Sequence, residues 1–311
     1  MIDERPGVLG SVSQAVGGTP IVELGRLAEG LPGRVLAKLE MQNPAGSVKD
    51  RLGVALLDAA EQRGLRPGAT VIEATGGNTG IGLASAAAVR GYRLVLTMPE
   101  SMSTERVALL RHLGAEVVLT EGILMTEAVR KAQELAAEIP GAFHVDQLSN
   151  PANPDLHRRT TAEEVWAQTR GTVDVFVSAV GTGGTITGVG EVLKQRKPSV
   201  RVVAVEPAGA AVLSGGKPGE HRMPGIGIGF IPAVLNRAII DEVVVVTDDE
   251  AFEGSRRLAR REGILAGVSA GAALHAALTI AARDEAAGKA IVVLLADSAE
   301  RYVASGLLDA H

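Results

Sequence analysis

Cysteine is absent from the 311 residues of the sequence. This absence excludes disulfide bonds, thiolate metal sites and a cysteine nucleophile. The six histidines show no spacing typical of metal ligands, so no metal site is predicted and we expect them to be surface or capping residues. They are His112, His144, His157, His221, His275 and His311.

Aromatic residues are also scarce, at 2% of the chain, so nucleic-acid bases would find few side chains on which to stack. The net charge of -5 and the lack of a long run of Lys and Arg argue against binding to a phosphate backbone. The start, MIDERPGVLG, lacks the features of a secretory signal, and no apolar run approaches the ~18 residues of a membrane span. We expect a cytoplasmic protein that binds neither nucleic acid nor membrane.

Eight short β-rich runs alternate with longer alanine-rich segments. The runs are continuously apolar, as in strands buried on both faces, and the segments between them carry apolar residues at helical spacing. This pattern predicts an α/β fold of mostly parallel, twisted sheets flanked by helices. The expected strands are 34–40, 70–75, 93–99, 116–120, 173–180, 200–207, 242–248 and 291–297.

A strong loop signal lies at 149–155, SNPANPD, with two prolines and three Asn or Asp residues. The length of the chain suits two lobes, and this signal predicts that they meet near residue 150. Ligands bind at the carboxyl ends of parallel strands. We therefore look for a site in the loops that follow strands.

The first such loop is VSAVGTGGTITG, 177–188, where a buried strand runs into a glycine-rich turn and then a helix. The free amides of the helix start and the two threonines would bind an oxyanion such as phosphate. Alternatively, the turn is a tight connection without a ligand. Neither nucleotide motif fits, because Ile186 stands at the last glycine position of a Rossmann fingerprint and no Walker lysine follows. The candidate phosphate-binding residues are Gly181, Thr182, Gly183, Gly184 and Thr185.

The second loop is EATGGNTGIGLA, 73–84, which again reads as strand, polar turn and helix. Its backbone amides, hydroxyl groups and carboxamide would suit a substrate carboxylate. Alternatively, Asn78 and Thr79 simply cap the helix. The candidate residues are Thr75, Gly76, Gly77, Asn78 and Thr79.

Lys49 stands at the start of a predicted helix, in PAGSVKDR. A lysine beside the positive end of a helix dipole is mildly unfavourable, and this conflict with a local rule points to function. A lysine whose pKa is lowered becomes a nucleophilic amine that can form a Schiff base. Such a lysine, a phosphate loop and a carboxylate loop together describe a pyridoxal phosphate enzyme.

These residues closely resemble the cysteine synthase (O-acetylserine sulfhydrylase) family of fold-type II pyridoxal phosphate enzymes, which are tryptophan synthase β-like. The resemblance implies a homodimer with its active site in a cleft between two lobes. A smaller substrate-binding lobe, 36–150, would carry the Schiff-base lysine, and a larger lobe of 1–35 with 151–311 would carry the phosphate loop. The matching motifs are GGTPIVEL (17–24), NPAGSVKDR (43–51), EATGGNTGIGLA (73–84), MPESMSTER (98–106), DQLSNPAN (146–153), GTGGTITG (181–188), GIGIGFIP (225–232), GILAGVSAGA (263–272) and DSAERY (297–302).

The resemblance also implies roles for single residues. Lys49 would hold pyridoxal 5'-phosphate as a Schiff base and act as the general base, while the loop at 181–185 would bind the phosphate. Asn78 would contact the ring 3-oxygen and Ser298 the pyridine nitrogen, where a general argument would instead choose Asp297. The implied substrate-binding residues are Thr75, Gly76, Gly77, Thr79, Gln147 and Gly225.

The implied reaction makes L-cysteine from O-acetyl-L-serine and sulfide. Gly76 stands where the family usually has a serine, so substrate preference is open. One rival is a cystathionine β-synthase-like enzyme, which differs mainly in its thiol acceptor, and serine and threonine dehydratases are more distant. A non-enzymatic rival is a regulatory partner of serine acetyltransferase, although intact Lys49, Asn78 and Ser298 favour catalysis.

A hydrolase is a further alternative, because GVSAG at 267–271 matches a nucleophile elbow. Ser269, Asp297 and His311 even follow in the hydrolase order. However, the preceding GILA is a weak strand, and His311 is the last residue, where fraying would defeat a triad. We expect Ser269 to belong to a helix start instead.

Overall fold

A computed structural model describes residues 7–122 and 125–309. The chain divides into two compact units, one of Met1–Val16 with Asn43–Asn153 and one of Gly17–Gln42 with Pro154–His311. The boundary expected at residue 36 falls inside strand β2 (Arg34–Leu39), which belongs to the sheet of the second unit. The second segment of the first unit therefore begins at Asn43, after the end of β2.

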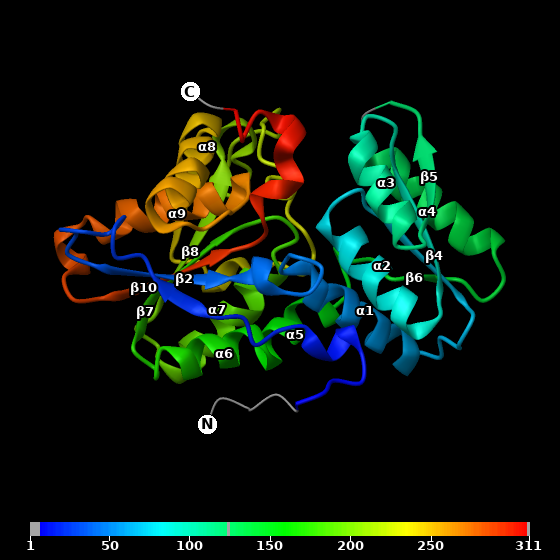
Figure 1. The fold of residues 1–311 in the computed structure, drawn as a ribbon, viewed down its shortest axis with the longest axis horizontal. Helices are drawn as coiled ribbons and strands as arrows, with labels where there is room; N and C mark the ends of the chain where they lie inside the picture. The colour runs from blue at the N-terminus through cyan, green and yellow to red at the C-terminus, as the bar shows by residue number, and fades with distance from the viewer. Residues whose placement is uncertain (1–6, 123–124, 310–311) are drawn as a thin grey trace. The chain divides into compact units, whose positions relative to one another are not determined.

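The first unit contains a four-stranded parallel sheet in the order β5-β4-β3-β6. Its strands are β3 (Thr70–Ala74), β4 (Arg93–Pro99), β5 (Glu116–Thr120) and β6 (Phe143–His144). Helix α4 (Met125–Glu138) packs on the face formed by Ile72, Ala74 and Val95 (Figure 1). Helix α3 (Thr104–His112) lies between β4 and β5 in the chain. The sequence did not predict β6, because two residues are too short to show a pattern.

Two helices of the first unit, α1 (Lys49–Gln62) and α2 (Asn78–Arg90), touch through their backbones. A Cβ on Gly53 would overlap the carbonyl group of Gly82, and a Cβ on Gly82 would overlap the carbonyl oxygen of Lys49. Only glycine permits so close an approach. The contact holds the first residue of α1 against the second turn of α2.

The second unit contains a six-stranded sheet in the order β1-β2-β10-β7-β8-β9. All neighbours are parallel except β1 and β2. Besides β2, its strands are β1 (Ile21–Glu23), β7 (Val173–Ala179), β8 (Arg201–Pro207), β9 (Glu242–Val246) and β10 (Ala290–Leu295). All eight expected strands are therefore present, and β1 joins β6 as a short strand that the pattern missed.

Helices cover both faces of the six-stranded sheet. Helices α8 (Asp248–Arg257) and α9 (Val268–Ala281) lie side by side and join one core with alternate residues of β7, β8 and β10 (Figure 1). Helix α7 (Gly184–Arg196) packs on the other face, through Ile186 against Val202 and Ala204. Successive side chains of a strand point to opposite faces of the sheet, and helices bury both faces. The strands are therefore apolar at every position rather than at every second one.

Helix α5 (Ala152–Arg159) begins within the segment expected to be a loop at 149–155, and α6 (Thr161–Gln168) follows it. The expected loop is therefore too long. Pro154 lies in the first turn of α5, where a helix tolerates proline because the first amides have no intrahelical partner.

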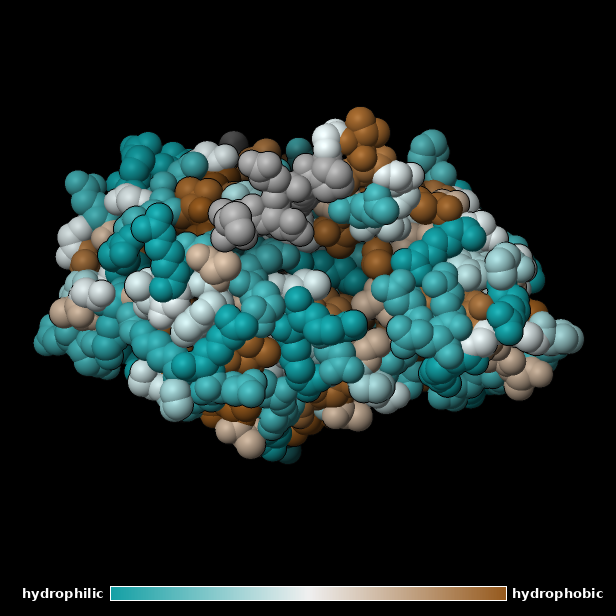
Figure 2. Space-filling view, turned by 90° about the horizontal axis from the view of Figure 1, so that it is seen from below, coloured by the Kyte–Doolittle hydropathy of each residue, from teal (hydrophilic) through white to brown (hydrophobic). Residues whose placement is uncertain are grey.

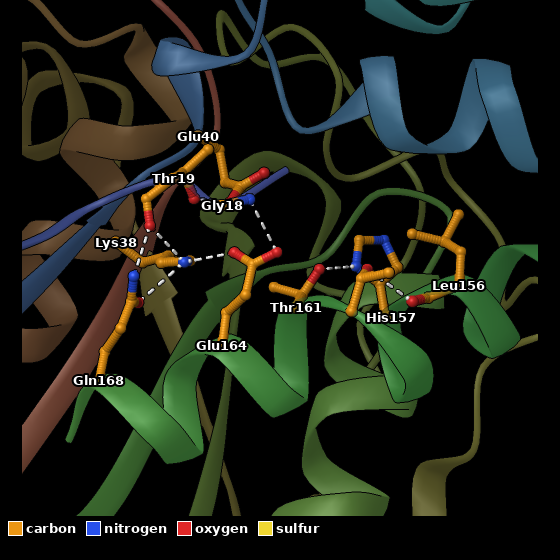
Figure 3. Close-up of polar contacts among 10 residues, drawn as sticks. Gly18, Thr19, Lys38, Glu40, Leu156, His157, Thr161, Glu164 and Gln168 are labelled. Atoms are coloured by element: carbon orange, nitrogen blue, oxygen red, sulfur yellow. Dashed lines mark hydrogen bonds and ion pairs between the residues drawn. The ribbon is translucent and has the colours of Figure 1, made fainter. Parts of the chain in front are cut away.

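Lys38 on β2 is fully buried, and Figure 3 shows its ammonium group among three oxygen acceptors. Lys38 Nζ lies 2.6 Å from the carbonyl oxygen of Thr19, 2.6 Å from Glu164 Oε2 and 2.9 Å from Gln168 Oε1. A buried ammonium group requires such partners, because its desolvation would otherwise be very costly. The cluster joins β2 to α6.

The face drawn in Figure 2 is mostly hydrophilic, with hydrophobic residues scattered across it. Within the described residues, the helices are too short or too polar to cross a bilayer.

Candidate active site

Lys49 is the first residue of α1, and its backbone amide donates to Ser47 Oγ at 3.2 Å. Burial lowers the pKa of the Lys49 ammonium group to about 8. Burial disfavours the charged form, so a large fraction of the side chain is a neutral amine near pH 8. A neutral amine is the nucleophile that Schiff-base formation requires.

The loop after β3 places three polar or small residues, Thr75, Gly76 and Gly77, before α2. Gly77 occupies the cap position of α2, and its amide donates to Thr75 Oγ1 at 3.2 Å. Asn78 and Thr79 are the first two residues of the helix. The capping alternative is therefore wrong, because a residue without a side chain holds the cap. Backbone amides at this helix start remain suited to an anion.

Gln147 lies beside this loop, although 68 residues separate it from Thr79. Thr79 Oγ1 donates to Gln147 Oε1 at 2.6 Å, and both side chains are buried. The close packing of Gly82 on Lys49 brings α1 to the same helix. The structure thus gathers Lys49, the loop at 75–79 and Gln147 within the first unit.

The second unit holds the predicted phosphate loop, between β7 and α7. Gly183 caps α7 with a φ of +83°, and a Cβ there would lie 2.8 Å from Leu235. A Cβ on Gly181 would overlap the carbonyl oxygen of Gly225, which itself has a φ of +87°. The turn therefore requires glycine, and it leads into the N-terminal amides of a 13-residue helix.

His157 lies under this loop, and the sequence did not identify it. Its Nε2 is 3.1 Å from Thr185 Oγ1, and its Nδ1 is 2.8 Å from Thr161 Oγ1, the contact drawn in Figure 3. The residue is 1% exposed, so the expectation of a surface or capping histidine is wrong here. Its partner Thr185 is 28 residues away, and no local pattern could have revealed the contact.

Comparisons with known proteins identify the family to which the chain belongs. A profile of the family described as "Pyridoxal-phosphate dependent enzyme" matches residues 12–297. A cysteine synthase from Staphylococcus aureus strain N315 is 49% identical over 300 residues, which are 96% of this chain and 96% of the relative. The chain belongs to the cysteine synthase family of pyridoxal-phosphate-dependent enzymes. This finding confirms the resemblance carried by the motifs.

Solved structures of the family agree. A cysteine synthase from Entamoeba histolytica is 41% identical and superposes with a TM-score of 0.95, over 99% of this chain and 93% of the other. A hydrogen sulfide-producing enzyme from Fusobacterium nucleatum is 40% identical with a TM-score of 0.91, over 95% of this chain and 100% of the other. The fold is therefore that of the fold-type II enzymes, as predicted.

The residues present fit the cofactor of this family. Pyridoxal phosphate requires an amine for its aldehyde and an anion-binding cradle for its phosphate. Lys49 offers an amine of lowered pKa, and the turn at 181–184, in which a Cβ at Gly181 or Gly183 would overlap Gly225 or Leu235, leads into the free amides at the start of α7.

Ser298 is the N-cap of a short 3-10 helix, Ala299–Ser305. Its Oγ donates to Glu300 Oε2 at 2.7 Å. Asp297 is buried, and its carboxylate accepts a hydrogen bond from the Tyr302 hydroxyl group. Its carbonyl oxygen accepts from the amide of Gly267 at 3.0 Å. Asp297 thus ties the end of β10 to the start of α9.

The hydrolase alternative has no support. Ser269 lies in the first turn of α9, and the loop at 263–267 stands where the elbow needs a strand. Asp297 is bonded to Tyr302, and the expected third member, His311, lies outside the described residues. Ser269 belongs to a helix start, as predicted.

Proposed function

We propose that the chain catalyses pyridoxal-phosphate-dependent β-replacement, making L-cysteine from O-acetyl-L-serine and sulfide. The observation that carries the proposal is Lys49, an amine with a pKa of about 8 held against the helix that follows the loop at 75–79. Membership of the cysteine synthase family supports the same reaction.

The cofactor, when bound, withdraws electrons from the substrate's Cα and so weakens its C–H bond. Lys49 Nζ would hold the cofactor covalently in the resting enzyme. With the substrate bound, the free Nζ would accept the Cα proton as a general base. Acetate leaves Cβ with its bonding electrons, hydrosulfide adds there, and Nζ returns the proton to Cα.

The loop at 75–79 and Gln147 would bind the substrate's carboxylate in this proposal. The amides at the start of α2 and the paired Thr79 and Gln147 side chains support that assignment. Residues 181–185 would bind the phosphate at the start of α7, with Gly225 packed against Gly181.

Asn78 and Ser298 would contact the cofactor ring. Asn78 begins α2, next to the cap at Gly77. Ser298 would turn its hydroxyl group from Glu300 to the pyridine nitrogen, which a hydroxyl group leaves unprotonated. A neutral ring is a weaker electron sink than a protonated one and favours elimination and replacement over transamination.

A second candidate is β-replacement with another acceptor. O-ureido-L-serine synthase is 44% identical, with a TM-score of 0.94 over 97% of this chain and 96% of the other, and its name describes a product other than cysteine. The test offers O-acetylserine with equal concentrations of sulfide and homocysteine and quantifies the products by mass spectrometry. We expect cysteine to form at least about tenfold faster than cystathionine. The reverse ratio would favour the cystathionine β-synthase-like alternative.

Gly76 offers a test of substrate binding. A Cβ at this position would lie 2.5 Å from Met102 Sδ, so Met102 fills the space that a serine side chain would need. We expect Gly76→Ser to raise the KM for O-acetylserine several-fold, and Gly76→Ser combined with Met102→Ala to restore it. The control is Met102→Ala alone. A KM for Gly76→Ser equal to that of the unchanged chain would show that Met102 moves freely and sets no limit.

The family resemblance also supports a homodimer, a cytoplasmic location and a complex with serine acetyltransferase. These assignments are part of the proposal. Binding of the acetyltransferase would add a regulatory role to catalysis rather than replace it.

A further inference from the structure

Gln147 is held at its backbone as well as at its side chain. Its carbonyl oxygen accepts a hydrogen bond from Asn153 Nδ2 at 2.9 Å, and its side-chain oxygen Oε1 accepts one from Thr79 Oγ1 at 2.6 Å. Asn153 is fully buried, and Gln147 is 8% exposed. Loss of the Asn153 side chain would remove a buried donor from a buried carbonyl group, which is more costly than loss of an exposed hydrogen bond. Asn153 therefore fixes the backbone from which the Gln147 side chain extends.

The residue before Gln147, Asp146, has a left-handed backbone conformation with a φ of +45°. Aspartate reaches this region more readily than most residues, because its short side chain bonds to nearby groups. Here Oδ1 accepts from the amide of Leu148 at 3.3 Å, and Oδ2 accepts from the hydroxyl group of Ser149. Such a conformation still costs energy and persists only where the surrounding structure holds it. The chain is thus turned sharply at the position that directs Gln147.

A second asparagine, Asn150, holds the same segment at a different place. Its Nδ2 donates to the carbonyl oxygen of Val145 at 2.8 Å, and its Oδ1 accepts from the amide of Ala152 at 3.0 Å. Asn150 therefore anchors the chain ahead of the sharp turn, whereas Asn153 anchors Gln147 after it. The asparagines of SNPAN, 149–153, were interpreted from the sequence as a loop signal, and the structure gives each of them a separate backbone carbonyl group to bind.

We infer that Asn153 is a positioning residue, which holds the Gln147 backbone so that the Gln147 carboxamide meets the substrate's carboxylate. The inference rests on the proposed function, in which Gln147 binds that carboxylate. Because Thr79 engages Oε1, the group that Gln147 offers to a ligand is its NH₂, a donor that suits a carboxylate. Asn153 fixes where this side chain starts, and Thr79 fixes how it is rotated. Both are needed, because a donor displaced by about 1 Å loses much of its hydrogen bond.

The test measures the dissociation constant of L-methionine for four forms of the holoenzyme: the unchanged chain, Asn153→Ala, Gln147→Ala and the variant with both changes. L-methionine matches O-acetylserine in length and has no leaving group, and its binding is followed through the visible absorbance of the bound cofactor. The control is Asn150→Ala, which removes two hydrogen bonds from the same segment and keeps the bond between Asn153 and Gln147. Steady-state rates with O-acetylserine and sulfide give KM and kcat for the same chains.

We expect Asn153→Ala to raise the dissociation constant of L-methionine by about tenfold, which is the loss of roughly one good hydrogen bond to the carboxylate. The KM for O-acetylserine should rise by a similar factor, with kcat within about threefold of the original. The variant with both changes should bind L-methionine about as weakly as Gln147→Ala alone, because Asn153 acts only through Gln147. Asn150→Ala should have the smaller effect on binding, within about threefold, although it loses more hydrogen bonds.

An unaltered affinity in Asn153→Ala, losses that multiply in the variant with both changes, or an equal loss in Asn150→Ala would each overturn the inference. If Asn153→Ala fails to fold, Asn153→Leu removes the same donor while it fills the buried space, and it carries the same comparisons. A folded, cofactor-loaded Gln147→Ala that binds L-methionine as well as the unchanged chain would instead overturn the place of Gln147 in the proposed function. The two failures are therefore distinguishable.

Discussion

Replacing Lys49 with alanine is expected to lower the rate of cysteine formation by at least about a thousandfold. The variant loses both the covalent link to the cofactor and the base that moves the Cα proton, because one atom, Nζ, provides both. No neighbouring amine replaces it at the start of α1, where Ser47 and Val48 precede it and Asp50 follows. Initial rates with O-acetylserine and sulfide measure the effect.

The control for this prediction is Lys131→Ala. Lys131 lies on α4 in the same unit and pairs with Glu134 at 3.5 Å, so its loss removes one positive charge without touching Lys49. We expect at most a small change in rate for this control. A Lys49→Ala variant that still makes cysteine at more than about a tenth of the original rate would contradict the assignment of Lys49.

Replacing Gly181 with alanine is expected to weaken cofactor binding by about a hundredfold or more. The added methyl group would overlap the carbonyl oxygen of Gly225, and the backbone cannot yield as a flexible side chain can. The loop at 181–185 must then shift, and the amides at the start of α7 lose their alignment with the phosphate. Titration of the cofactor-free protein with pyridoxal phosphate, followed by absorbance, gives the dissociation constant.

Gly25→Ala is the matched control for this change. Gly25 belongs to the same unit, and a Cβ there meets no atom within 4 Å. It should bind the cofactor as the unchanged chain does. The thermal unfolding of both variants separates a local effect on the loop from a general loss of stability. An unaltered cofactor affinity in Gly181→Ala would show that the turn does not hold the phosphate.

The sequence predicted the strands well where they are long and buried. Continuous apolar runs such as 291–297, when they alternate with helical segments, are typical of strands buried in the core. The strands it missed, Ile21–Glu23 and Phe143–His144, are too short to show a period. The same limit affected the unit boundary, because nothing in the sequence shows that β2 pairs with β10 some 250 residues later.

The two loops and Lys49 were predictable because each is a local sequence pattern with a recognisable chemical role, either anion binding or a nucleophilic amine. A glycine-rich turn between a strand and a helix is visible in the sequence alone. His157 was not predictable in this way. Its partner Thr185 lies 28 residues further along the chain, and only the folded structure brings the two together.

The most direct test of the central claim follows the cofactor's visible absorbance in the loaded protein through a single reaction cycle. We predict that O-acetylserine alone shifts the absorption band and releases acetate. Adding sulfide should then return the band to its starting position, with one cysteine formed per active site. A band that does not respond to O-acetylserine, or that shifts and does not return with sulfide, would contradict the account.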